Sequence, residues 1–482
     1  MNGDASGPTL IPEADQRLDK NVVGLWGALI MTLAFMAPAM SLFFTTPSMV
    51  GSTGAPVPLA YLIAMVGVLC TGNALIQFSR RFSSTGTFVT FMSKGFGGSI
   101  GLVGAIVLLT GYLLAASTVI CIFGSWTHDM LVRYASISVP WQLISVVAAI
   151  VLTGLAVRGL HISTETAAVL FAFEVLVLVV VSVVVISKGG HQGQAIDAIL
   201  PSKVTTWNGF GLAAILAVYS FLGYEGAVPL GEETANPRRN TPLAVAIAII
   251  SLGILYFLVT YAAIVGFGVS HLDALASDSA FFDTMAKQYL GGAGIFVALA
   301  GFTSTLGSGL AILNVQPRIL YNISRAGLFP ELVSHSHPRW HTPWVAIIVF
   351  GSIITVIPLI GSAFGLDPLT IFAVFGTWGG LPITCIYMVV NLALIIFWFS
   401  HKRDGSPWTH LVIPLIGMAV WIWPIYLAAK PGSGLFGWTW IWVVGPAIAG
   451  TVFMLLIRKR RDPGRLAAVI AGESEVEGGE SL

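Results

Sequence analysis

The chain has 482 residues, of which 56% are apolar and 9% are charged, with 23 basic and 22 acidic side chains. A soluble domain carries roughly 25% charged residues, so this composition excludes a soluble protein. The net charge of +1 excludes the basic face of a nucleic-acid-binding domain. The apolar residues form continuous runs and do not alternate, which argues against a β-barrel. The composition therefore predicts an all-α polytopic membrane protein.

A membrane-spanning helix needs about 20 apolar residues, and the chain offers twelve runs near this length. In chain order they cover residues 22–50, 57–79, 99–126, 141–157, 164–187, 208–231, 243–268, 289–322, 343–363, 368–399, 409–429 and 438–457. Polar links with Gly and Pro separate the runs. The N-terminal tail, residues 1–20, lacks the pattern of a signal peptide. The C-terminal tail, residues 458–482, is acidic and Gly-rich after Arg465 and is predicted to be disordered.

Lysine and arginine in the links predict the orientation of the chain, because cytoplasmic loops are enriched in them. With the N-terminus inside, 18 of the 23 basic residues fall on the inner side and 5 on the outer side. This bias requires an even number of spans. It predicts a multi-pass protein of the cell (inner or plasma) membrane with both termini cytoplasmic.

Two acidic residues lie well inside apolar runs, Glu174 in LFAFEVLVLVV and Glu225 in YSFLGYEGAVPL. No lysine or arginine lies comparably deep in the sequence pattern. A buried carboxyl group without a counter-charge favours its neutral form. Each acid is thus either a neutral group bonded to a neighbouring helix or a functional group that exchanges a proton or meets a cationic substrate.

The first and sixth runs carry helix breakers. Pro38 lies in the middle of the first run, and the sixth contains Gly223, Gly226 and Pro229. These runs begin two successive five-helix blocks, for which paired interruptions indicate a transporter site near the bilayer midplane. The alternative is a pair of simple proline kinks. The blocks, residues 21–190 and 205–400, form a ten-helix core over residues 21–400, followed by two accessory spans in residues 408–457.

The eighth run carries a polar stripe of Thr303, Ser304, Thr305, Ser308 and Asn314. Small hydroxyl residues often serve only to pack helices, and the alternative is that Ser308 or a neighbour lines an ion site. Tyr219 and, less strongly, Tyr112 are aromatic residues that either cover a ligand or pack between helices.

Other chemistry finds little support. The cysteines at 70, 121 and 385 lie in apolar runs, and their spacing suggests no disulfide framework or zinc site. His335, His337 and His341 fit no common metal-site spacing. No phosphate-binding fingerprint or nucleophile–base pair is present, so we expect no catalytic residue, cofactor or metal.

Three segments resemble the amino acid–polyamine–organocation (APC) superfamily of permeases. They are FLGYEGAVPLGEETANPRRNTPLAVAIAI, RILYNISRAGLFPELVSHSHPRWHTP and PSMVGSTGAPVPLAYLI, and the similarity extends over residues 20–460. The resemblance implies twelve transmembrane helices in a five-plus-five inverted repeat, with discontinuous helices 1 and 6 and two accessory helices.

The resemblance also implies roles for individual residues. Tyr219 matches the family's aromatic gate, and Glu225 matches a helix 6 acid implicated in proton coupling in some relatives. Glu174 falls where some proton-coupled relatives carry a lysine that replaces a sodium ion near the position of Ser308. The first break resembles the proline-bearing variant of putrescine-type importers, which makes an amine-bearing substrate an alternative to an amino acid.

We therefore expect a secondary active transporter, or permease, for an amino acid or small amine, which works by alternating access and is coupled to protons. The expected substrate-binding residues are Ala37, Pro38, Ala39, Met40, Ser41, Tyr112, Tyr219, Ser220, Gly223 and Glu225. The expected coupling residues are Glu174, Glu225 and Ser308. A substrate exchanger and a sodium-coupled symporter are alternatives, and a non-transporting membrane receptor is a remote one. The sequence leaves the oligomeric state open.

Overall fold

A computed structural model describes residues 24–81, 87–159, 164–227, 234–325, 329–340, 342–401, 403–430 and 434–458. The predicted N-terminal tail, positions 229 and 341, and all but the first residue of the predicted C-terminal tail lie outside the described residues.

The described part of the chain is helical and contains no β-strand, as the composition predicts. The α-helices are α1 (Leu25–Met36), α2 (Pro38–Thr53), α3 (Val57–Ser79), α4 (Thr87–Phe96), α5 (Gly98–Ala135), α6 (Trp141–Val157), α7 (Thr164–Ser187), α8 (Trp207–Ser220), α9 (Pro237–Phe267), α10 (Leu272–Ser277), α11 (Phe281–Leu290), α12 (Gly294–Val315), α13 (Pro317–Arg325), α14 (Trp344–Ala363), α15 (Pro368–Ser400), α16 (Ile413–Ala429) and α17 (Ile441–Arg458). A 3₁₀ helix, η4 (Tyr224–Ala227), follows α8, and further short 3₁₀ and π turns lie in the links.

Within the described ranges, eleven helical segments are long and apolar enough to cross a membrane. The predicted fourth span is the shorter apolar helix α6, with 17 residues. This length lies at the lower limit for a membrane-spanning helix. Each of the twelve predicted runs thus meets a helix, and the polytopic all-α fold is confirmed.

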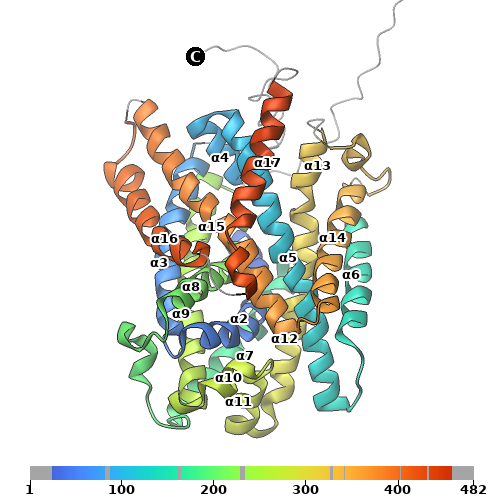
Figure 1. Ribbon diagram of the computed structural model, residues 1–482, viewed down its shortest axis with the longest axis vertical. Coiled ribbons are helices and arrows are strands. Elements are labelled where there is room, and N and C mark those ends of the chain that lie inside the picture. The colour runs from blue at the N-terminus through green and yellow to red at the C-terminus, as the bar shows by residue number, and fades with distance from the viewer. Residues whose placement is uncertain are drawn as a thin grey trace, which may run out of the picture.

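The two ends of the bundle differ. Figure 1 shows α4, α13 and the end of α17 at one end, and α10 and α11 at the other. Short α4, α10 and α11 were not predicted as separate helices, because they are too short for a spanning run. We call the two ends the α4 end and the α11 end.

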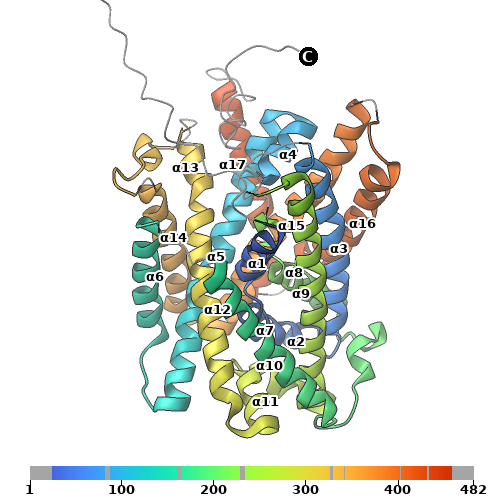
Figure 2. The same ribbon diagram turned by 180° about the vertical axis from the view of Figure 1, so that it is seen from behind.

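The interrupted spans lie at the centre. The most apolar stretch of the α8–η4 span is 83% buried, whereas that of the last span is 11% buried. Figure 2 shows α1 and α8 between the long helices α3, α5, α9 and α12. The last span therefore faces its surroundings, and the breaks lie in the interior.

A buried ion-pair cluster ties α11 to α5 at the α11 end. Asp283 has a fully buried side chain and lies 3.0 Å from both Arg133 of α5 and Lys287. The Tyr134 hydroxyl donates a hydrogen bond of 2.6 Å to the same carboxylate. At the α4 end, Arg81 and Asp404 form a more exposed pair at 3.1 Å.

Candidate functional site

The first break is a single left-handed residue. α1 ends at Met36, Ala37 has φ 46° and ψ 68°, and Pro38 begins α2. A left-handed backbone costs a residue with a Cβ roughly 1–2 kcal/mol. Proline suits the first position of a helix because its missing N–H has no partner there in any case. The Ser41 hydroxyl donates to the Met36 carbonyl at 3.2 Å and so satisfies one acceptor that the break exposes.

The second break follows α8. The chain turns at residues 221–223 before η4 begins at Tyr224. Gly223 has φ 102°, and a Cβ at this position would lie 2.1 Å from Cδ1 of Phe35 on α1. Only glycine allows this backbone and this close approach together. The second break therefore packs directly against the helix that leads into the first break.

Glu225 lies on the second break and binds Tyr112 of α5. The Tyr112 hydroxyl donates to Oε1 of Glu225 at 2.9 Å, and the Gly223 N–H donates to Oε2 at 3.2 Å. The Glu225 side chain is buried and forms no ion pair with any described residue. The structure thus joins two predicted site residues, Tyr112 and Glu225, and leaves the acid without a fixed counter-charge.

Glu174 of α7 meets the first break. Its buried carboxyl group contacts the Ser304 hydroxyl of α12 and the backbone of Ala39, and its Oε2 has no hydrogen-bond partner in the part of the chain that the structure describes. The same Ser304 hydroxyl accepts a hydrogen bond of 3.2 Å from the Met40 N–H. Ser304 therefore links α12 to the start of α2 and to Glu174.

The predicted ion-site residue Ser308 lies about one helical turn beyond Ser304 on α12 and is also buried. Sequence reasoning placed Ser304 only in the general polar stripe. The residue of α12 that contacts the first break is Ser304, and the role of Ser308 stays a prediction.

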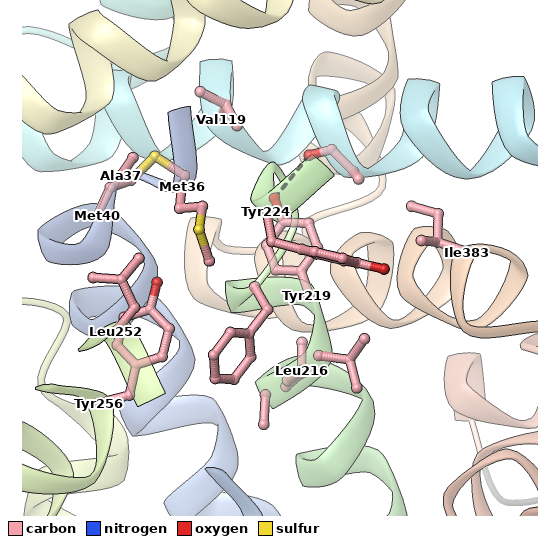
Figure 3. Packing of buried hydrophobic residues seen from close by; sticks show 14 of the residues in the cluster. Met36, Ala37, Met40, Val119, Leu216, Tyr219, Tyr224, Leu252, Tyr256 and Ile383 are labelled. Carbon is pink, nitrogen blue, oxygen red and sulfur yellow. Dashed lines mark hydrogen bonds between the residues drawn. The ribbon is translucent and has the colours of Figure 1, made fainter. Parts of the chain in front are cut away.

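Tyr219 of α8 packs beside the site. Its hydroxyl lies 2.6 Å from that of Thr118 and donates to the Ala115 carbonyl at 2.9 Å. Its ring meets Phe372 edge-on, with centroids 5.7 Å apart. Figure 3 shows Met36, Met40, Tyr219 and Tyr224 in the same region around the first break. The predicted aromatic residue therefore lies close to both breaks.

A hydroxyl network that the sequence did not reveal supports the site from the other side. The Tyr61 hydroxyl of α3 lies 2.6 Å from Thr45 and 2.9 Å from Ser220, and the Tyr256 hydroxyl of α9 donates to the Ser220 carbonyl at 2.7 Å. Buried tyrosines usually find a partner for the hydroxyl. This rule was the one available signal for Tyr61 and Tyr256. Through Ser220, a predicted site residue, the network fixes the last residue of α8.

Aromatic rings separate the site from the α11 end. Phe43 of α2 stacks on Trp126 of α5 at 4.9 Å and on Phe282 of α11 at 5.2 Å. All three side chains are almost fully buried. The path from the breaks toward α11 is therefore packed in this conformation.

Known proteins resemble this chain over almost its whole length. The sequence model of a family described as "Amino acid permease" matches residues 23–457. The chain is 26% identical over 449 residues to the low-affinity putrescine importer PlaP of Escherichia coli, which covers 89% of this chain and 92% of that protein. It is 24% identical over 371 residues to the branched-chain amino acid permease BcaP of Bacillus subtilis, covering 72% and 76% of the two chains. It is 22% identical over 446 residues to the methylthioribose transporter of Bacillus subtilis, covering 86% and 89%.

Proposed function

Because the chain belongs to the amino acid permease family, we propose that it imports a small organic amine or an amino acid by alternating access, with protons as the coupling ion. It is a membrane transporter and not an enzyme. The substrate and the coupling ion are the parts of the proposal that need support from the site.

The observation that carries the proposal is the placement of two buried carboxyl groups at two broken helices. Glu225 lies on the second break, and Glu174 touches the first. Among the described residues, no lysine or arginine is buried. A site with acids and no fixed cation complements an ammonium group or a proton. The similarity to PlaP, a putrescine importer, supports an amine substrate. The similarity to BcaP, a branched-chain amino acid permease, supports an amino acid substrate.

The proposed transport motion is a movement of the interrupted spans against the helices around them. The second break packs against the end of α1 through Gly223 and Phe35, so a movement of the second break would also displace the helix that leads into the first. The first five spans, in residues 21–190, and the next five, in residues 205–400, would form the inverted repeats of a core that extends over residues 21–400, with accessory spans in residues 408–457. The α4 end would face the cytoplasm, since the exposed Arg80, Arg158 and Arg238 lie there.

The test is uptake of radiolabelled putrescine and amino acids into proteoliposomes with an imposed pH gradient. We expect gradient-driven uptake by the unaltered protein and a loss of at least tenfold for Glu225→Gln and Glu174→Gln. Glu165→Gln is the matched control, because Glu165 lies in the exposed first turn of the same helix as Glu174. It should transport normally.

Three results would contradict the proposal. Normal gradient-driven uptake by both glutamine variants would show that neither Glu174 nor Glu225 carries the proton. Loss of uptake when choline replaces sodium would identify a sodium symporter, and uptake only into preloaded vesicles would identify an exchanger.

A further inference from the structure

A basic cavity opens between α3 and α9 at the α4 end of the bundle, away from the transport site. Figure 2 shows these two helices side by side. The cavity has a volume of about 440 Å³. Its basic lining is Arg80, Arg238 and Arg239, and its apolar lining includes Ile76, Pro242 and Leu243.

The three arginines are exposed residues, and none forms an ion pair with another described residue. No carboxylate is among the described residues that line the cavity. Arg81, the neighbour of Arg80, is by contrast paired with Asp404. The cavity therefore gathers three positive charges without a described internal partner.

Two of these charges are placed where the helix does not favour them. Arg238 and Arg239 lie in the first turn of α9, which contains no acidic residue. The start of a helix carries partial positive charge, so cations there are unfavourable and an anion is stabilised. A bound anion would be attracted by the arginines and by the start of the helix together.

An apolar track continues from the cavity along α9. Leu243, Ile250 and Ile254 are 39%, 44% and 60% exposed. Their spacing of seven and four residues places them on one face of the helix. In a membrane-spanning helix such a face meets acyl chains. The occupant of the cavity thus needs an anionic head and an apolar tail.

We propose that this cavity binds the headgroup of an anionic phospholipid from the leaflet around the α4 end. Arginine donates paired hydrogen bonds to phosphate oxygens. Basic pockets between spanning helices are a known type of lipid headgroup site. A free phosphate compound shares the head but lacks the tail that would follow Leu243.

The test measures the thermal unfolding temperature of the purified full chain in detergent. The probes are phosphatidylglycerol, phosphatidylcholine and soluble glycerol phosphate. We expect phosphatidylglycerol to raise this temperature more than either other probe. The variant Arg238→Gln/Arg239→Gln should lose at least half of that rise. The control Arg158→Gln/Arg339→Gln removes the same charge from exposed arginines outside the cavity and should keep it.

Equal losses in the two double variants would overturn the proposal, because general charge would then explain the effect. An equal rise with glycerol phosphate would assign the cavity to a soluble anion and also overturn it. If the glutamine variant does not fold, Arg238→Lys/Arg239→Lys keeps the charge but loses the paired hydrogen bonds. It should show a smaller rise than the unaltered protein, and an unchanged rise would count against the site.

Discussion

Gly223→Ala tests whether the two breaks truly depend on close contact. Two effects add at this position. The φ of 102° is unfavourable for any residue with a Cβ, at a cost of roughly 1–2 kcal/mol. The new Cβ would also lie 2.1 Å from Cδ1 and 2.9 Å from Cε1 of Phe35, whereas carbon atoms pack at about 3.5–4.0 Å. Forcing an extra methyl group into a packed interior costs about 1–3 kcal/mol.

The expected loss in the free energy of unfolding is therefore about 2–5 kcal/mol. Gly291→Ala is the matched control, because Gly291 also has a positive φ, 65°, but nothing lies within 4 Å of its added Cβ. It should show only the cost of its backbone conformation, without the clash.

Thermal unfolding of the purified proteins, followed by intrinsic fluorescence, gives the order of stability. Uptake into proteoliposomes gives the functional effect, and Gly223→Ala should also transport less than Gly291→Ala. If the two variants unfold at the same temperature, Phe35 does not contact the second break, and the reasoning about this contact is refuted.

Two further predictions concern stability. Asp283→Asn removes a fully buried carboxylate from two ion pairs and should destabilise the protein by about 3 kcal/mol, the low end of the range for broken buried pairs because its partners are partly exposed. The control Asp404→Asn, in an exposed pair, should cost under about 1 kcal/mol. Equal melting temperatures of the two variants would contradict this difference. Ser304→Ala leaves the buried Met40 N–H without its acceptor and should cost about 1–3 kcal/mol. Thr303→Ala, whose hydroxyl bonds only within its own helix, should cost less by the same fluorescence assay, and the opposite order would show that Ser304 does not link α12 to α2.

The breaks were predictable because backbone chemistry is local. Proline and glycine restrict or free the backbone wherever they occur, so Pro38 and Gly223 marked the interruptions without knowledge of any neighbour. The run lengths marked the spans for the same reason. The search for long apolar runs did not reveal the short helices α4, α10 and α11 in the links. Their lengths of 6 to 10 residues are far below the length of a span.

The partners of the acids were not predictable, because pairing depends on how helices far apart in sequence pack. Tyr112 and Glu225 were each expected at the site, but their hydrogen bond joins residues 113 positions apart. Ser304 was one of several similar hydroxyl residues on one run. Packing alone selects it as the contact of Glu174 and Met40.

The alanine at the first break holds a left-handed backbone, which is unfavourable for a residue with a Cβ. A glycine at position 37 would remove the steric cost of this left-handed backbone and would give the residue a wider range of φ and ψ values. The methyl group of Ala37 restricts its backbone and makes the left-handed conformation a source of local strain. A right-handed backbone at residue 37 would relieve this strain, but Ala37 is only 2% exposed and Pro38 disfavours a right-handed helical conformation in the residue before it, so the break is built into the span.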